Sequence, residues 1–366
     1  MTRHRFAAAR VAAWVGLLAL VGPAARAQTD APTLQGCAEI GSSSDRLVCY
    51  DKLAGRAVVP PVAAASAPGV PPTTSQLAAS DTAVAQAPPA ASGSSLTSKF
   101  WELDPGDKRG TFNFTGYRAN YVLPMHVTNR INRSPDSPTQ PAVTTPDYRR
   151  IEGKIQLSLR TKVVQGLLLP DADLWAAYTQ QSLWQVYNGT DSKPFRNTDY
   201  EPELIYVVPT PEALRRLPFG WQWRYAQLGV AHQSNGQSDP LSRSWNRVYL
   251  GAGFERGDIA LTAKVLTRLK ESLDDDNNPD LTAYRGRAEF QLSWTPGAAT
   301  ASLGYRNSFR DARRGALQAE FTYPVYRDQP NGIRWYLQAF TGYGETLTDY
   351  NFRQTSVGAG LTFLQF

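Results

Sequence analysis

Long hydrophobic runs, histidine, cysteine and concentrated positive charge are all scarce in this sequence. Beyond residue 27, no apolar stretch reaches the ~20 residues that a transmembrane helix needs, and mean hydropathy is −0.38. The 38 Lys and Arg residues against 32 Asp and Glu residues give a net charge of +6, and they are scattered along the chain. Nucleic-acid binding is therefore not indicated. A membrane β-barrel is not excluded, because its strands need only alternate apolar and polar residues.

The first residues instead indicate export. Arg3, His4, Arg5 and Arg10 precede the apolar run 11–21, which leads to the small-residue pattern Ala25-Arg26-Ala27. This order predicts a signal peptide over residues 1–27. The alternative, a single membrane-spanning helix, is disfavoured because the run is too short.

Composition divides the rest of the chain into three parts. Residues 28–55 form a small element that contains the only two cysteines, Cys37 and Cys49. In an exported protein such a close pair forms a disulfide more often than a metal or redox site. Residues 56–99 are rich in Ala, Pro and Ser, which is typical of an extended, disordered linker. Residues 100–366 form the main domain.

The main domain alternates apolar and polar residues in segments of about ten to sixteen residues, the length of tilted membrane strands. In one example the predicted outer face comprises Tyr284, Gly286, Ala288, Phe290, Leu292 and Trp294. Twelve such segments are expected, near 110–122, 149–164, 172–187, 199–209, 220–233, 244–255, 257–270, 280–294, 298–309, 314–325, 332–346 and 354–366. We therefore predict an all-β fold, a twelve-stranded antiparallel transmembrane β-barrel, preceded by the signal peptide and linker. The alternative is a soluble β-sandwich.

Connections of alternating length orient this barrel. The predicted link 123–148 is long, whereas 255–258 and 295–297 are tight turns. Because bacterial barrels have long outer loops and short periplasmic turns, the loop 235–243 is predicted to be extracellular. Once the signal peptide is removed, only two histidines remain. His126 follows Pro124 in a predicted loop and is expected to be solvated.

The second histidine, His232, shares strand parity with Val230, Leu228 and Ser234, and on the next strand Asn246 shares parity with apolar residues. All three polar residues are thus predicted to face lipid, where polar groups are costly and suggest a function. A serine hydrolase fits: Ser234 attacks an ester while His232 takes the proton. Asn246 orients the imidazole, at less cost in a hydrocarbon environment than a carboxylate. Taken alone, however, the pattern His-x-Ser favours the other interpretation, in which these polar residues lie at the rim of a barrel by chance.

Longer sequence motifs favour a catalytic site over chance placement. They are YTQQSLWQ at 178–185, PFR at 194–196, DYEPE at 199–203, HQSNG at 232–236 and SDPLSRSWNRVY at 238–249. Together they resemble the bacterial outer membrane phospholipase A family, over roughly residues 100–366. The resemblance implies the roles just given for Ser234, His232 and Asn246, and an oxyanion hole that uses the Gly236 amide.

The resemblance also implies a calcium ion near the reacting ester. Its expected ligands are Ser242 and the carbonyl of Gln237, with Asp239 in the same loop; the family often carries Arg where Gln237 stands. A partner subunit would complete the site from the loop 190–194, for which Ser192 is the candidate. The acidic run 274–276 is a candidate for a second calcium through Asp274, the alternative being a solvated loop.

The resemblance, together with the strand pattern, implies a homodimeric, calcium-dependent phospholipase A of the bacterial outer membrane that acts on sn-1 and sn-2 acyl esters. The rival function is a passive channel or structural barrel. Charged residues expected to fill the lumen argue against an open pore; they are Lys264, Arg285, Arg287, Arg306 and Glu320.

Overall fold

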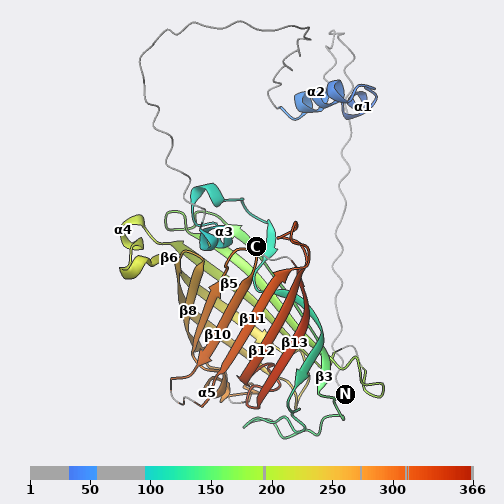
Figure 1. The fold of residues 1–366 in the computed structure, drawn as a ribbon, viewed down its shortest axis with the longest axis vertical. Helices are drawn as coiled ribbons and strands as arrows, with labels where there is room; N and C mark the ends of the chain where they lie inside the picture. The colour runs from blue at the N-terminus through green and yellow to red at the C-terminus, as the bar shows by residue number, and fades with distance from the viewer. Residues whose placement is uncertain are drawn as a thin grey trace, which may run out of the picture. The chain divides into compact units, whose positions relative to one another are not determined.

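A computed structural model describes residues 33–55, 95–192, 195–272, 274–309, 311 and 313–363 (Figure 1). These residues belong to two compact units, one within residues 1–84 and one within residues 85–366. The predicted signal peptide, 1–27, and residues 56–94 of the predicted linker lie outside the described residues. None of the helices in the described part of the chain is long and apolar enough to cross a membrane.

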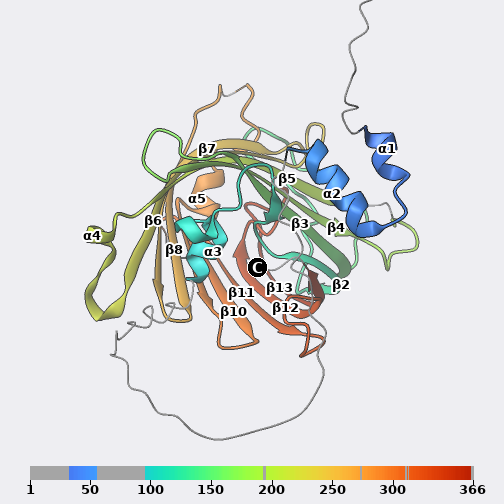
Figure 2. The ribbon, with the colours of Figure 1, turned by 90° about the horizontal axis from the view of Figure 1, so that it is seen from above.

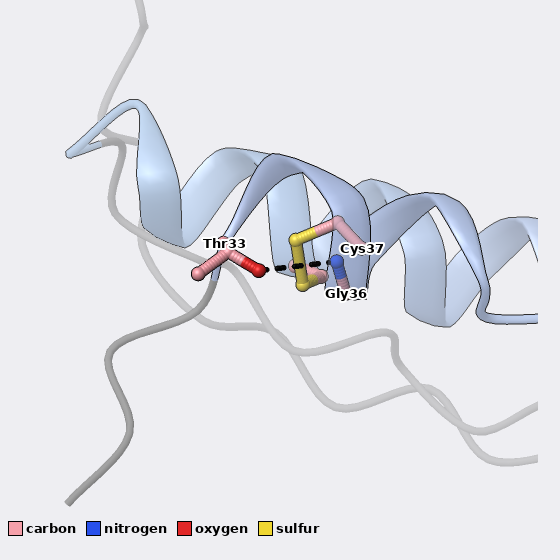
Figure 3. The surroundings of a disulfide bond; sticks show 4 residues. Thr33, Gly36 and Cys37 are labelled. Atoms are coloured by element: carbon pink, nitrogen blue, oxygen red, sulfur yellow. Dashed lines mark hydrogen bonds between the residues drawn. A yellow bond between two sulfur atoms is a disulfide. The ribbon is translucent and has the colours of Figure 1, made fainter.

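The first unit contains helices α1 (Leu34–Ala38) and α2 (Ser43–Leu53). Thr33 begins α1, and its hydroxyl accepts a hydrogen bond of 3.2 Å from the Gly36 amide (Figure 3). Such a cap satisfies a backbone donor that has no partner within the helix. A disulfide joins Cys37 to Cys49, as predicted, and therefore links the two helices.

The second unit is a closed antiparallel barrel in which each strand pairs with its neighbours along the chain. The twelve strands are β2 (Asn120–Thr128), β3 (Ile151–Val164), β4 (Asp173–Trp184), β5 (Asn197–Pro209), β6 (Gln222–Ser234), β7 (Ser244–Arg256), β8 (Ile259–Arg268), β9 (Ala288–Trp294), β10 (Thr300–Asn307), β11 (Ala316–Pro324), β12 (Arg334–Tyr343) and β13 (Arg353–Phe363). Pairing of β13 with β2 closes the ring. A short extra strand, β1 (Phe114–Gly116), pairs with β3 beyond the end of β2. The twelve-stranded barrel predicted from the sequence is confirmed.

Two predicted segments differ from the structure. The first strand lies later than 110–122, because β2 continues through Pro124 to Thr128 across an irregularity in its pairing with β3. In the segment 280–294, residues Leu281–Arg285 form a helical turn, α5, so β9 begins only at Ala288. The ring of Tyr284 packs near Tyr350 instead of facing lipid.

The shift of the first strand changes the position of His126. Expected to be solvated in a loop, this residue is 1% exposed, and its Nε2 lies 2.9 Å from Glu345 Oε1. The prediction failed because Pro124 was interpreted as the end of the strand, whereas the irregularity in pairing accommodates a residue that cannot donate a backbone hydrogen bond.

The two faces of the wall differ in polarity. Leu228, Leu250 and Val357 are 46%, 60% and 56% exposed on the outside. Inside, Arg118 donates to Glu201 at 2.6 Å and to Glu203 at 2.9 Å. Other buried or half-buried polar residues at predicted lumen positions are Lys264, Arg285, Arg306 and Glu320. Arg287 is exposed, contrary to the prediction, because it lies where the chain enters β9. Ion pairs and hydrogen bonds therefore occupy the lumen.

Helix α3 (Leu96–Trp101) lies within the ring of strands in the view down the barrel (Figure 2). Trp101 is 4% exposed, and its ring centroid is 5.7 Å from that of Trp175. The Ser95 hydroxyl caps the helix by accepting from the Ser98 amide. Residues 95–99, which the sequence assigns to the linker, are thus part of the barrel domain.

This packing sets a boundary for truncation. We expect a chain that lacks residues 28–94 to fold as the full chain does. Extending the deletion through Trp101 should destabilise the barrel by about 3–5 kcal/mol, the cost of removing a large buried aromatic. Heat-dependent migration in gel electrophoresis, followed across a denaturant series, measures both effects. Equal stability of the two truncated chains would contradict this assignment of α3.

Candidate active site

Strands β6 and β7 bring the predicted polar residues together on the outside of the barrel. In their register, His232 is opposite Asn246 and Ser234 is opposite Ser244. His232 is exposed, as are Val230 and Leu228 on the same face. The alternate residues Ala231, Gln233 and Trp245 are buried on the inner face. Because successive side chains of a strand point to opposite faces, this burial pattern places His232, Ser234 and Asn246 on the outward face.

The histidine and the asparagine form a direct contact. His232 Nδ1 lies 2.8 Å from Asn246 Oδ1, and Asn246 Nδ2 donates to Glu271 Oε1 at 2.7 Å. Because an ionised carboxylate only accepts hydrogen bonds, the asparagine must direct its NH2 group to Glu271 and its oxygen to His232. His232 Nδ1 then donates, and Nε2 is left as the acceptor.

Ser234 lies two residues after His232 on the same face, a spacing of about 6.6 Å along a strand. Among the described residues no hydrogen bond joins the two side chains. Contacts of this kind are often longer without substrate and shorten in the reacting complex. The strand therefore places the Ser234 hydroxyl beside the imidazole of His232, whose Nε2 can accept a proton.

Gly236 follows the end of β6 with a φ of +62°. A Cβ atom at this position would lie 2.9 Å from Cε2 of Tyr200, so only glycine fits without displacement of the ring. This conformation turns the chain sharply after Ser234.

Hydrogen bonds hold the loop 235–243 in one shape. Asn235 Oδ1 accepts from the Arg243 amide at 2.9 Å, and Asn235 Nδ2 donates to the Leu241 carbonyl at 2.8 Å. Arg243 is fully buried and donates to the carbonyls of Pro240 and Ser242. Burial lowers the pKa of the Arg243 guanidinium. Asn235 and Arg243 thus fix the loop that carries Gly236 and Ser242.

The predicted calcium ligands are only partly assembled. Ser242 Oγ accepts from Asn277 Nδ2 at 2.9 Å. Gln140 Nε2 donates to Asn277 Oδ1 at 2.9 Å and to Asp239 Oδ1 at 3.4 Å. Asn277 and Gln140 were not predicted, because both lie outside the motifs at 178–249 that carry the resemblance. Asp274 and Ser192 are exposed, and it is Asn277 of the β8–α5 loop that reaches Ser242.

The donor chemistry of this loop fits a hard cation. A serine hydroxyl, a carboxylate and a backbone carbonyl are oxygen donors, and calcium takes six to eight of them. Within the described residues there is no cluster of three or more His, Cys, Asp or Glu side chains suited to a metal. Ser242, Asp239 and the Gln237 carbonyl would therefore supply only part of a coordination shell.

A barrel with a serine, a histidine and an asparagine on its outer wall falls in the class of membrane-embedded β-barrel hydrolases. Comparison with known proteins gives the particular family. The sequence pattern described as phospholipase A1 matches residues 97–363. Phospholipase A1 of Salmonella typhimurium is 35% identical over 277 residues, which cover 75% of this chain and 87% of that protein.

Two solved structures are also similar. Outer membrane phospholipase A from Escherichia coli is 34% identical with a TM-score of 0.58, covering 68% of this chain and 93% of that chain. The outer membrane phospholipase of Salmonella typhi, solved as a dimer with bound calcium, is 34% identical with a TM-score of 0.60, covering 70% and 94%. The chain therefore belongs to the phospholipase A1 family of outer-membrane β-barrel enzymes, which are carboxylic ester hydrolases.

Proposed function

We propose that this enzyme is a calcium-dependent phospholipase A that cleaves sn-1 and sn-2 acyl esters of phospholipids in the outer leaflet. The observation that carries the proposal is the 2.8 Å contact of His232 with Asn246, two residues from Ser234 on the outward face. His232 is exposed on this wall, so an ester at either position of a neighbouring lipid can approach it.

In the proposed reaction, Ser234 Oγ attacks the ester carbonyl as His232 Nε2 takes its proton. Asn246 holds the imidazole with Nδ1 donating to Oδ1. The Gly236 amide donates to the oxygen on which negative charge develops. His232 returns the proton to the departing lysophospholipid alcohol. Water then attacks the acyl-serine by the same route and releases the fatty acid.

Calcium, held by Ser242, the Gln237 carbonyl and Asp239, would supply positive charge near that oxygen. These three residues are too few to fill its shell. We therefore propose that a second copy of the chain contributes the remainder, with Ser192 as the candidate. The relative from Salmonella typhi supports the proposal, since it was solved as a calcium-bound dimer. Asp274 remains a proposed ligand for a second ion, in an exposed position.

The experiment that tests the function uses purified, refolded full-length protein and phospholipid in mixed micelles with calcium. Release of fatty acid and lysophospholipid is the expected result. Stepwise conductance in a planar bilayer without ester hydrolysis would instead favour the rival, a passive channel. The ion pairs of Arg118 with Glu201 and Glu203 inside the barrel argue against that rival.

Variants of the two partners of the imidazole contact should differ in severity. We expect His232→Ala to lower kcat about 10⁴-fold or more, because it removes the group that takes the proton. Asn246→Ala should lower kcat by a smaller factor, since it removes only the orienting contact. Initial rates of fatty acid release at saturating phospholipid measure both. Equal losses in the two variants would assign Asn246 a different role.

A further inference from the structure

Glu271 is a charged residue beside the proposed catalytic residues that the sequence reasoning did not include. It lies three residues after the end of β8, and its Oε1 accepts from Asn246 Nδ2 at 2.7 Å. That contact and the one between Asn246 and His232 are both within normal hydrogen-bond length. Glu271, Asn246 and His232 thus form a continuous chain that ends beside Ser234.

An asparagine needs such a partner more than an aspartate does. The two ends of its amide are similar in shape, but only one of them accepts a hydrogen bond. If the amide turned over, its NH2 group would face His232 Nδ1, and the imidazole could no longer donate there. A carboxylate on the far side allows one orientation only. Hydrogen bonds to a charged acceptor are also about twice as strong as neutral ones.

The carboxylate itself is held in place. Arg268 Nη2 lies 3.4 Å from Glu271 Oε2 and 2.6 Å from Asp276 Oδ1. The backbone amide of Leu269 donates to the Asn246 carbonyl at 2.9 Å, which fixes the start of the loop against β7. The side chain of Glu271 is 18% exposed, so the charge retains some contact with water. A carboxylate is less costly at this position, beyond the strand end, than on the lipid-facing wall.

We propose that Glu271 is a positioning residue for ester hydrolysis, which acts through Asn246 to hold His232 in the tautomer that accepts the Ser234 proton. This inference rests on the proposed function. Its effect falls on kcat, because the contact chain concerns proton transfer and leaves the lipid-facing wall unchanged.

The first part of the test compares single variants that show unaltered heat-dependent gel migration. Glu271→Ala should lower kcat about 10-fold and leave KM within about twofold. Glu271→Gln keeps an oxygen acceptor for Asn246 and should lose less. Asp147→Asn is the matched control for loss of one negative charge, because Asp147 is 91% exposed on a different loop. The kcat and KM of this variant should equal those of the unaltered enzyme. Wild-type kcat in Glu271→Ala would overturn the proposal.

The second part exchanges the two groups. Asn246→Asp alone places two carboxylates at hydrogen-bonding distance and should lower kcat further than Glu271→Gln does. In the double variant Asn246→Asp, Glu271→Gln, the new glutamine NH2 group can donate to the new aspartate. We expect the double variant to exceed Asn246→Asp at least about fivefold in kcat. If Glu271 had only a structural role, the free-energy costs of the two substitutions would add, and the double variant would be slower than Asn246→Asp. A double variant that is no faster than Asn246→Asp would overturn the proposal.

The proposed function can fail separately from this inference. Absence of ester hydrolysis in the unaltered protein would overturn the function. Hydrolysis that survives Ser234→Ala would overturn the assignment of the nucleophile, and either result would remove the basis of the role of Glu271. Loss of hydrolysis in Ser234→Ala together with full activity in Glu271→Ala would overturn only the positioning role.

Discussion

Replacing Ser234 by alanine is expected to lower kcat at least about 10⁴-fold, because loss of the proposed nucleophile leaves only substrate binding and oxyanion stabilisation. The barrel should fold normally, since Ser234 is a half-buried side chain at the end of β6 and its backbone keeps its place opposite Ser244. Fatty acid release over a long incubation measures the residual rate, and heat-dependent gel migration measures folding.

Ser244 provides a matched control for that experiment. It is directly opposite Ser234, is also half-buried, and holds no part in the proposed reaction. Ser244→Ala should retain hydrolysis within about threefold. Substantial activity in Ser234→Ala, or an equal loss in Ser244→Ala, would remove the reason to assign Ser234 as the nucleophile.

Removing calcium is expected to cost about 10²–10³-fold in kcat, the usual effect of losing a principal group that stabilises an oxyanion. The physical reason is that the neutral Gly236 amide alone would then face the developing charge. Titration of activity against free calcium after treatment with chelator measures the effect, and added calcium should restore the rate. Full activity in excess chelator would contradict the calcium requirement.

Two serines of one loop can separate calcium binding from loop folding. Ser242→Ala removes a proposed ligand and should raise the calcium concentration needed for half-maximal activity. Ser238 lies in the same loop and accepts hydrogen bonds through its carbonyl from the amides of Leu241 and Ser242, which alanine also provides. Ser238→Ala should therefore titrate as the unaltered enzyme does. Identical shifts in both variants would indicate a change in loop folding.

Alternation along the strands was sufficient to predict the barrel, because each wall residue faces one of two environments of opposite polarity. The outward positions of Leu228, Val230 and His232 follow from that rule alone. The rule fails at strand ends, where local chemistry decides. The predicted strand 280–294 begins too early, since Leu281 is fully buried in a cluster with Trp245 and Tyr350, and the chain there forms α5.

The sequence alone could not predict contacts between segments that lie far apart in the chain. Glu345 comes from the β12–β13 loop, yet it accepts from Lys154 Nζ at 2.9 Å and lies at the same distance from His126. Burial raises the pKa of the Glu345 carboxyl, but the cationic neighbour Lys154 and the contact with His126 outweigh burial and hold that pKa well below its usual range. No periodicity in the sequence could bring these three segments together.

The candidate site, like the fold, could be predicted from the sequence only in part. Strand parity placed Ser234, His232 and Asn246 on one face, and their roles came from resemblance to a family. Glu271 and Asn277 lie 25 and 31 positions after Asn246 in a loop without regular structure. Their contacts with Asn246 and Ser242 depend on how that loop folds back over the strand ends. Tertiary structure was needed to find them.

Because His232 faces outward, the rate of hydrolysis should depend on the concentration of phospholipid within the membrane surface and not on its bulk concentration. A site that opens on the barrel wall receives its lipid by lateral diffusion within the leaflet, without passage through water. The rate should therefore follow the mole fraction of phospholipid in the surface, so that added detergent slows hydrolysis even when the bulk phospholipid concentration is constant. By the same reasoning, an inhibitor must first partition into the membrane, and its potency will depend on that partition as much as on its fit to Ser234.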